Sequence, residues 1–263
     1  MADLVYPPVI AVARALFRLQ GLRFDIQGAY NVPRTGGAVL AINHVGYFDF
    51  TYAGYAARPA GRLVRFMAKS EVFSHPVAGP LMRGMHHISV DRSAGAASFR
   101  RAIEVLRAGE IVGVFPEATI SMSFELKAFK NGAVRMAADG GVPLIPMVIW
   151  GSQRVWTKGR PKRLGRHHVP IRIAVGEPMN PSPTQDRDAA TSKLRERMAA
   201  LLADLQRYYP DRPAHPSDGW WLPARLGGTA PTPEQAKELE KAIRAEQIAR
   251  HQAKAARAAA RNS

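Results

Sequence analysis

The fold is decided by one stretch, Ala38-Val39-Leu40-Ala41-Ile42-Asn43-His44-Val45-Gly46-Tyr47-Phe48-Asp49. Its first five residues form a short apolar run after two glycines, a pattern typical of a buried strand. Asp49 begins a segment that can continue as a helix. His44 is therefore expected at the carboxyl end of a strand, which is where open α/β sheets bind their ligands.

His44 and Asp49 are five positions apart, so the carboxylate can reach the imidazole ring. A carboxylate on one ring nitrogen orients the neutral ring so that the other nitrogen can take a proton from a substrate hydroxyl. Such a pair works without a serine nucleophile. The alternative is a buried structural histidine followed by a helix-capping aspartate, and the motif alone leaves both interpretations open.

Three further segments follow in order, at Gly84 to Arg92, Val114 to Ser121 and Val142 to Val148. Together with Asn43 to Asp49 they resemble the four sequence blocks of the glycerolipid acyltransferases, the family that includes 1-acylglycerol-3-phosphate acyltransferase. The resemblance covers residues 24–180. It implies direct acyl transfer to a lysophospholipid hydroxyl, with acyl-CoA or an acyl-carrier protein as the donor.

The resemblance also implies roles for individual residues. His44 would be the catalytic base and Asp49 the group that orients it. A second set would bind the acceptor, with two residues at the glycerol moiety and three cations at the phosphate: Glu117, Thr119, Arg92, Lys69 and Lys130.

The third block departs from the family pattern Phe-Pro-Glu-Gly-Thr-Arg-Ser, because this chain has Ala118 for the glycine and Ile120 for the arginine. An arginine holds a phosphate through two parallel hydrogen bonds, whereas isoleucine donates none. Either the acceptor has a different polar head, as a glycolipid or an aminolipid does, or another cation holds the phosphate: Lys69, Arg92, Lys127 or Lys130.

Apolar runs alternate with segments of helical periodicity along the chain. We expect strands at 22–26, 37–42, 64–68, 87–90, 111–115, 144–150 and 171–175, and helices at 49–57, 98–108, 129–138 and 188–208. This alternation predicts an α/β fold, a single domain whose largely parallel or mixed sheet of about seven strands is flanked by helices. The expected divisions are an N-terminal helix, an acyltransferase domain and a C-terminal arm with a basic helical tail, at 1–21, 22–210 and 211–263.

Composition limits the functional classes. The 263 residues are 46% hydrophobic and 22% charged, as in an ordinary globular protein. The chain has no cysteine, which excludes disulfides, thiolate metal ligands and a thiol nucleophile. The histidines lack established ligand spacings, so we expect no metal, and no cofactor other than acyl-CoA as cosubstrate. A formal net charge of +16 indicates an anionic partner, either nucleic acid, lipid headgroups or a polyanionic cosubstrate.

The N-terminal segment from Tyr6 to Gln20 is predicted to form an amphipathic helix with prolines in its first turn. Its apolar residues Val9, Val12, Leu16 and Leu19 share one face. This face fits either a membrane interface, our prediction, or packing on the sheet. We expect no membrane-spanning segment and no signal peptide, and hence a peripheral protein at the cytoplasmic face of the cell membrane.

The segment from Trp150 to His168 carries cations and no acidic residue. It could bind coenzyme A phosphates, anionic lipid or single-stranded nucleic acid, or be a solvated loop. Contact with a membrane or coenzyme A is favoured because it agrees with the acyltransferase blocks, and no nucleic acid is expected. A non-enzymatic basic membrane or RNA-binding protein is the alternative from another class. The residues predicted for this contact are Arg154, Lys158, Arg160, Lys162 and Arg163.

The C-terminal part changes character after Tyr209-Pro210, where a Pro/Gly/Trp-rich arm begins. Thr232 is predicted to cap a helix that has Pro233 at its first position and Gln235 at its third. The rest of this helix has few apolar residues, so we expect a solvated basic tail.

Overall fold

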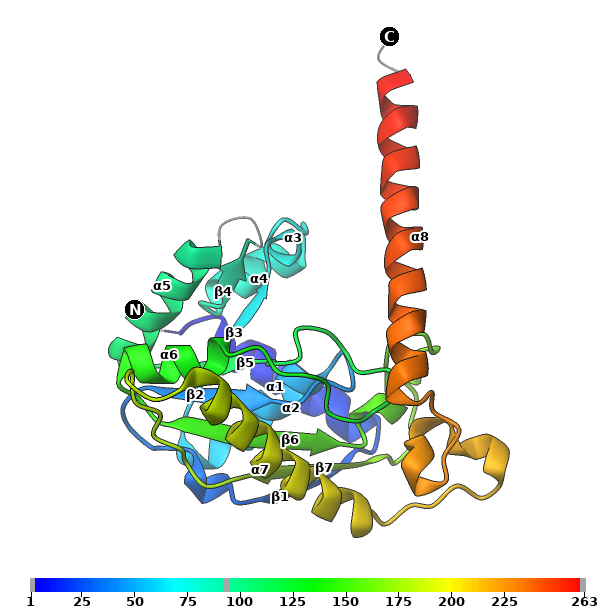
Figure 1. Cartoon of the computed structure of the whole chain (residues 1–263), viewed down its shortest axis with the longest axis horizontal. Helices are drawn as coiled ribbons and strands as arrows, with labels where there is room; N and C mark the ends of the chain where they lie inside the picture. The colour runs from blue at the N-terminus through cyan, green and yellow to red at the C-terminus, as the bar shows by residue number, and fades with distance from the viewer. Residues whose placement is uncertain (1–2, 92–94, 261–263) are drawn as a thin grey trace. The chain divides into compact units, whose positions relative to one another are not determined.

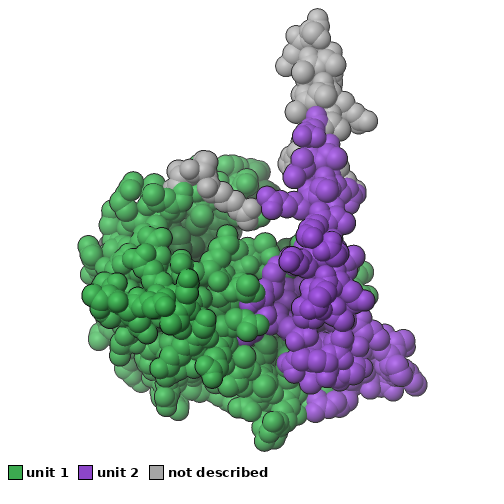
Figure 2. Space-filling view, in the orientation of Figure 1, with its two compact units in different colours: residues 1–120, 128–211 green, residues 121–127, 212–263 purple. Residues whose placement is uncertain are grey.

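The structure, a computed structural model, describes residues 3–91 and 95–260. It contains two compact units, shown in green and purple in Figure 2. The sheet unit comprises the chain up to Ile120 and Ala128–Asp211, and the tail unit comprises Ser121–Lys127 and the chain from Arg212. The N-terminal helix belongs to the sheet unit, and the division at Asp211 lies next to the predicted start of the arm.

The sheet unit is built on a seven-stranded sheet with the order β1-β7-β6-β2-β5-β3-β4. β6, β2, β5, β3 and β4 run parallel, and β7 is antiparallel to β6. The predicted α/β fold is confirmed, and each predicted strand is present to within one residue at either end. The strands are Arg23–Gln27 (β1), Ala38–Ile42 (β2), Val64–Lys69 (β3), Ile88–Val90 (β4), Ile111–Val114 (β5), Leu144–Trp150 (β6) and Pro170–Val175 (β7).

Helices cover both faces of this sheet, with α1 and α2 on one face and α5, α6 and α7 on the other (Figure 1). Every residue of β2 and of β6 is buried as a result. Two short helices, α3 and α4, were not predicted. The α-helices of this unit are Tyr6–Leu19 (α1), Asp49–Ala56 (α2), Ser70–Phe73 (α3), Ala78–Gly84 (α4), Gly95–Arg107 (α5), Gly132–Gly140 (α6) and Arg187–Arg207 (α7); 3-10 turns lie at Ala29–Asn31, Arg58–Ala60 and Ser152–Arg154.

Helix α1 packs against the rest of the sheet unit on one side and leaves apolar residues exposed on the other, so each interpretation of the N-terminal segment describes one side of the helix. Tyr6 and Phe17 are buried in the sheet unit, and the Tyr6 hydroxyl donates to the Val64 carbonyl at 2.7 Å. The opposite side is open to solvent, because three of the four predicted apolar residues are 60%, 52% and 71% exposed: Val12, Leu16 and Leu19. The helix therefore packs through one side and presents an apolar stripe on the other.

The tail unit contains 3-10 turns at Pro216–Trp221 and Ala224–Leu226 and the long helix α8, Pro233–Ala260. The predicted cap of α8 is present, since the Thr232 amide donates to Gln235 Oε1 at 2.9 Å and the Gln235 amide donates back to Thr232 Oγ1 at 3.3 Å. Lys127 forms an ion pair with Glu240 at 2.6 Å within this unit. The helix thus begins where the capping pattern predicts.

His87 is a buried titratable group of the sheet unit. Its Nδ1 accepts a hydrogen bond from the Phe66 amide at 3.1 Å, and its ring packs edge-on against Tyr6. Burial, assisted by the nearby charge of Arg65, lowers the pKa of His87 from 6.5 to about 4. The protonated ring is therefore incompatible with this packing near neutral pH.

We expect protonation of His87 to destabilise the folded chain in acid. Between pH 6.5 and about 4 the unfolded state binds this proton and the folded state does not. The contribution to the free energy of unfolding is complete above pH 6.5 and falls by about 3 kcal/mol as the pH approaches 4. His87→Asn retains an acceptor for the Phe66 amide and should flatten this dependence in urea titrations. Equal pH dependence in both proteins would contradict the assignment.

Candidate active site

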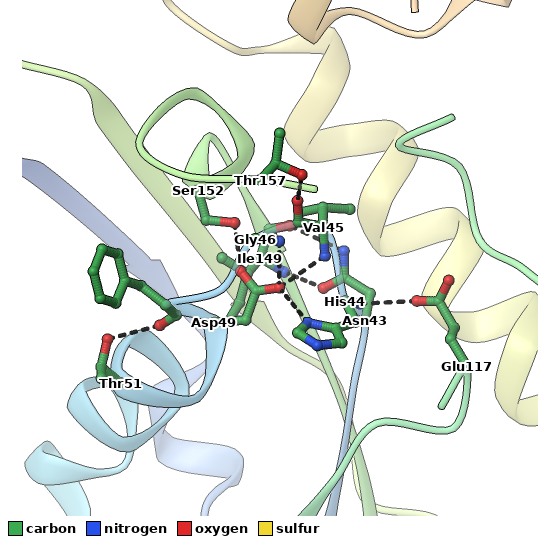
Figure 3. A network of polar contacts seen from close by, with 11 residues as sticks. Asn43, His44, Val45, Gly46, Asp49, Thr51, Glu117, Ile149, Ser152 and Thr157 are labelled. Atoms are coloured by element: carbon green, nitrogen blue, oxygen red, sulfur yellow. Dashed lines mark hydrogen bonds and ion pairs between the residues drawn. The ribbon is translucent and has the colours of Figure 1, made fainter. Parts of the chain in front are cut away.

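The residues predicted for the reaction lie at the edge of the sheet where the parallel strands end. β2 has β6 and β5 as its parallel neighbours, so the carboxyl ends of these three strands meet. His44 follows β2, Glu117 follows β5 and Ser152 follows β6. Figure 3 shows these side chains grouped around the turn from Asn43 to Asp49.

His44 and Asp49 are in direct contact, with 3.0 Å between Nδ1 and Oδ2. Because an ionised carboxylate can only accept, Nδ1 carries the hydrogen and Nε2 keeps its lone pair. The His44 side chain is 20% exposed, whereas that of Asp49 is fully buried. The imidazole also stacks on Phe115, with ring centroids 4.2 Å apart. The ring is thus held on one edge and on one face.

The carboxylate of Asp49 is surrounded by hydrogen-bond donors. Oδ2 accepts from the Val45 amide at 2.7 Å and from the Gly46 amide at 2.8 Å, in addition to His44. Oδ1 accepts from the Ser152 hydroxyl. Asp49 is also the first residue of α2, where the helix dipole favours negative charge. These contacts satisfy a charge that would otherwise be costly to bury.

Glu117 holds the backbone of the histidine. Its Oε1 accepts a hydrogen bond from the His44 amide at 2.9 Å, and its side chain is buried. The next residue, Ala118, has a φ of 61°, in the left-handed region that favours glycine. Glu117 therefore has a structural contact with the base in addition to the acceptor role implied by the resemblance.

Strand β6 and the segment after it attach to the same turn. The Asn43 side chain donates to the Ile149 carbonyl at 3.0 Å and accepts from the Ile149 amide at 2.7 Å. The buried Thr157 hydroxyl donates to the Val45 carbonyl at 2.7 Å. Together with Ser152, these contacts fix both ends of the turn (Figure 3).

Sequence reasoning missed Asn43, Ser152 and Thr157 as site residues. Asn43 belongs to the quoted motif, but nothing in the spacing indicates that its amide bonds to a strand that lies about a hundred residues later. For Ser152 the available signal was its place directly after a predicted parallel strand. That signal places Ser152 at the edge of the sheet where the parallel strands end, but it does not predict the hydrogen bond to Asp49.

The cations predicted for the acceptor phosphate have different surroundings. Lys69 is the exposed last residue of β3, at the same edge of the sheet as His44. Lys130 is exposed, and its amide donates to the Pro116 carbonyl in the loop that carries Glu117. Arg92 lies outside the described residues. Thr119 is half-buried, and Ile120 is only 6% exposed.

The basic segment after β6 divides into an anchored part and an exposed part. Arg154 is paired with Asp211 at 2.5 Å and donates to the Tyr209 hydroxyl at 3.0 Å, so its charge serves the fold. Lys162 lies over the Trp156 ring, 4.3 Å from its centroid. The Tyr47 amide, in the turn from Asn43 to Asp49, donates to the Trp156 carbonyl at 3.0 Å. The other four cations predicted for contact with a membrane or coenzyme A are half-buried or exposed: Lys158, Arg160, Lys162 and Arg163.

The site can perform base catalysis on a hydroxyl group. A neutral imidazole with a buried carboxylate on Nδ1 presents Nε2 to an incoming proton. Among the side chains that the structure describes, no three His, Asp or Glu residues form a group that could hold a metal ion. The described helices include none that is long and apolar enough to cross a membrane.

Comparison with known proteins places these residues in a family. The acyltransferase family model matches residues 23–150. The 1-acyl-sn-glycerol-3-phosphate acyltransferase of Bacillus subtilis is 31% identical over 181 residues, which cover 67% of this chain and 81% of the relative. The protein of the same name from Limnanthes alba is 32% identical over 62% of this chain, and the match spans 56% of the plant protein.

The fold agrees with this sequence relationship. The crystal structure of the 1-acyl-sn-glycerophosphate acyltransferase PlsC from Thermotoga maritima superimposes with a TM-score of 0.63 at 23% identity. The match covers 76% of this chain and 78% of that structure. With a relative above 30% identity that is matched over most of its length, this chain belongs to the glycerolipid acyltransferase family and is an O-acyltransferase.

Proposed function

We propose that this enzyme transfers a fatty acyl chain from acyl-CoA to a hydroxyl of lysophosphatidic acid or a similar lysophospholipid, in phospholipid biosynthesis. The observation that carries the proposal is the His44–Asp49 pair, in which Nδ1 is held and Nε2 is left to accept a proton. The names of the Bacillus and Limnanthes relatives support this acceptor. An acyl-carrier protein is the alternative donor.

The reaction proceeds in one direct transfer. Nε2 of His44 takes the proton of the acceptor hydroxyl as its oxygen attacks the thioester carbonyl carbon. Asp49 stabilises the imidazolium that forms. The carbon–sulfur bond then breaks, and the departing thiolate takes this proton from His44. The products are the acylated lipid and free coenzyme A, and no cofactor or acyl-enzyme is required because a thiolate leaves readily.

The acceptor is held next to Glu117 and Thr119, which follow β5. Lys69 and Lys130 supply the positive charge for its phosphate, together with Arg92. Lys127 is a weaker candidate, because its ammonium group is engaged by Glu240. This arrangement replaces the arginine that the family pattern has at position 120.

A different acceptor head group is the alternative, favoured by the burial of Ile120. A glycolipid or an aminolipid acceptor would not need a phosphate-binding arginine there. Purified protein assayed with palmitoyl-CoA and oleoyl-CoA against lysophosphatidic acid, other lysolipids, glycolipids and glycerol-3-phosphate distinguishes these acceptors. Failure to acylate any of them would contradict the proposal and favour a non-enzymatic basic membrane or RNA-binding protein.

We expect His44→Ala to lower turnover by about 10²- to 10⁴-fold, because a positioned base contributes about that much. Asp49→Asn should also be severe, because an amide can present its donor group to Nδ1 and does not carry the charge that stabilises imidazolium. Thermal unfolding should show that both variants fold. The exposed His215, in the tail unit, provides the control variant His215→Ala, which should keep wild-type turnover. Normal turnover in folded His44→Ala would contradict the mechanism.

Neutralising the phosphate-binding cations should affect the acceptor more than the donor. Losing one charge-assisted hydrogen bond costs about 1.5–3 kcal/mol, so Lys69→Met or Lys130→Met should raise the acceptor KM by about 10- to 150-fold. The donor KM should change little. Lys193→Met, on the exposed side of α7, is the matched control. Wild-type acceptor kinetics in both site variants would rule out these residues.

We also propose that the enzyme is peripheral at the cytoplasmic face of the membrane. The exposed stripe of α1 supports this, because Val12, Leu16 and Leu19 are apolar and have no cover among the described residues. The basic segment after β6 supplies positive charge for anionic lipid headgroups or for the phosphates of coenzyme A. The apolar stripe would be insensitive to salt, and the basic contribution would weaken as salt rises.

Substituting the stripe should reduce vesicle binding without harming the fold. The triple variant V12S/L16S/L19S leaves the buried side of α1 intact and should lose the salt-resistant part of flotation with anionic vesicles. Reversing the charges of Arg160, Lys162 and Arg163 should reduce the salt-sensitive part. Leu239→Ser, which changes an exposed leucine of α8, is the control. If neither the stripe variant nor the charge-reversal variant changed flotation, α1 and the basic segment would not be the parts of the protein that bind the membrane.

A further inference from the structure

We propose that Ser152 is a positioning residue of this enzyme, whose hydroxyl holds the Asp49 carboxylate in the orientation from which it directs His44. The inference deepens the proposed acyl transfer and rests on it. Ser152 lies 103 residues after Asp49 and comes from a different strand end. The motif that contains His44 and Asp49 therefore gives no indication of this contact.

The two carboxylate oxygens of Asp49 have different partners. Oδ2 accepts from His44 and from two backbone amides of the turn, which are all local in sequence. Oδ1 accepts from Ser152 Oγ. Rotation about the Cβ–Cγ bond would displace both oxygens, so the Ser152 hydroxyl on Oδ1 adds a second restraint to the one that the donors to Oδ2 provide. Ser152 thus supplies the restraint on Oδ1, which receives no hydrogen bond from the turn in these contacts.

The position of Ser152 is itself tightly defined. The two Asn43–Ile149 hydrogen bonds fix the end of β2 against β6 just before Ser152. A Cβ atom on residue 46 would lie 2.8 Å from Ser152 Oγ and 3.0 Å from its carbonyl carbon. Glycine at position 46 therefore allows the turn to approach Ser152 closely. Ser152 and Asp49 are both buried, so this contact is shielded from bulk water.

Removing this hydroxyl should change the electrostatics of the pair as well as its geometry. Donation from Ser152 disperses part of the charge of Asp49. Without it the carboxylate attracts the protonated imidazole more strongly, and His44 should take up its proton at higher pH. The neutral ring, which is the form that accepts the substrate proton, should also be less well oriented. Both effects lower turnover while leaving substrate binding intact.

Thr157 provides a matched control. Its hydroxyl is also buried and also donates to the catalytic turn, but it bonds to the neutral Val45 carbonyl and not to the carboxylate. Thr157→Val removes that hydroxyl without a large change in shape. A purely structural loss should therefore appear in Thr157→Val and in Ser152→Ala alike, whereas only Ser152→Ala should alter the protonation of His44.

The test compares wild type, Ser152→Ala, Ser152→Thr and Thr157→Val, with kcat and both KM values measured across pH. We expect Ser152→Ala to lower kcat about tenfold, with both KM values nearly unchanged. The acid limb of its kcat–pH profile should move to higher pH. Ser152→Thr, which keeps a hydroxyl, should restore the wild-type limb if its added methyl group fits, and Thr157→Val should leave the limb in place.

A second measurement is independent of turnover. NMR titration of the His44 ring protons, assigned by their loss in His44→Gln, follows protonation of the ring without substrate. An upward shift of the midpoint in Ser152→Ala alone would support the proposal. Midpoints that coincide with wild type, or equal shifts in Thr157→Val, would overturn it. Absence of acyl transfer by the wild type would reject the proposed function, and the NMR comparison would still test the Ser152–Asp49 contact.

Discussion

The active site depends on one buried negative charge, the carboxylate of Asp49. Removing a carboxylate from water is costly unless donors replace the lost hydration. Here the donors are the Val45 and Gly46 amides, the His44 ring and the Ser152 hydroxyl. They come together only if α2 begins at Asp49 and the ends of β2 and β6 are neighbours. The contacts that satisfy the charge of Asp49 therefore also orient the His44 imidazole.

The departures from the family pattern lie in the loop after β5, beside this arrangement. Ala118 adopts a left-handed conformation that costs an alanine about 1 kcal/mol, a strain that the family glycine would not have. Ile120 is buried, so an arginine side chain placed there could not remain in the same environment. The proposed reaction keeps Glu117 and His44 and assigns the acceptor phosphate to cations elsewhere at the sheet edge.

The cations of this chain also differ in their surroundings. The net charge of +16 does not act as one uniform field, because some cations are internal supports, as Arg154 is with Asp211. Others, including Lys162 over the Trp156 ring, lie in a segment that is hydrogen-bonded to the catalytic turn. An anion bound by this segment would lie close to the reaction. Helix α1 adds an apolar stripe on its exposed side, while its other side completes the core.

The sequence by itself determined the seven strands, the main helices and the local pair of His44 and Asp49. Burial on both faces leaves a continuous apolar run in strands such as β2, and helix caps such as Thr232 with Gln235 use neighbouring residues. The contacts of Glu117, Ser152 and Asn43 were decided only by the tertiary structure. Their partners are 73, 103 and 106 residues away in the chain, and β2 lies between β6 and β5 although neither of them is its neighbour in the order of strands along the chain. Spacing along a chain records which groups are neighbours within a turn, whereas the order of strands in a sheet follows from packing the whole core.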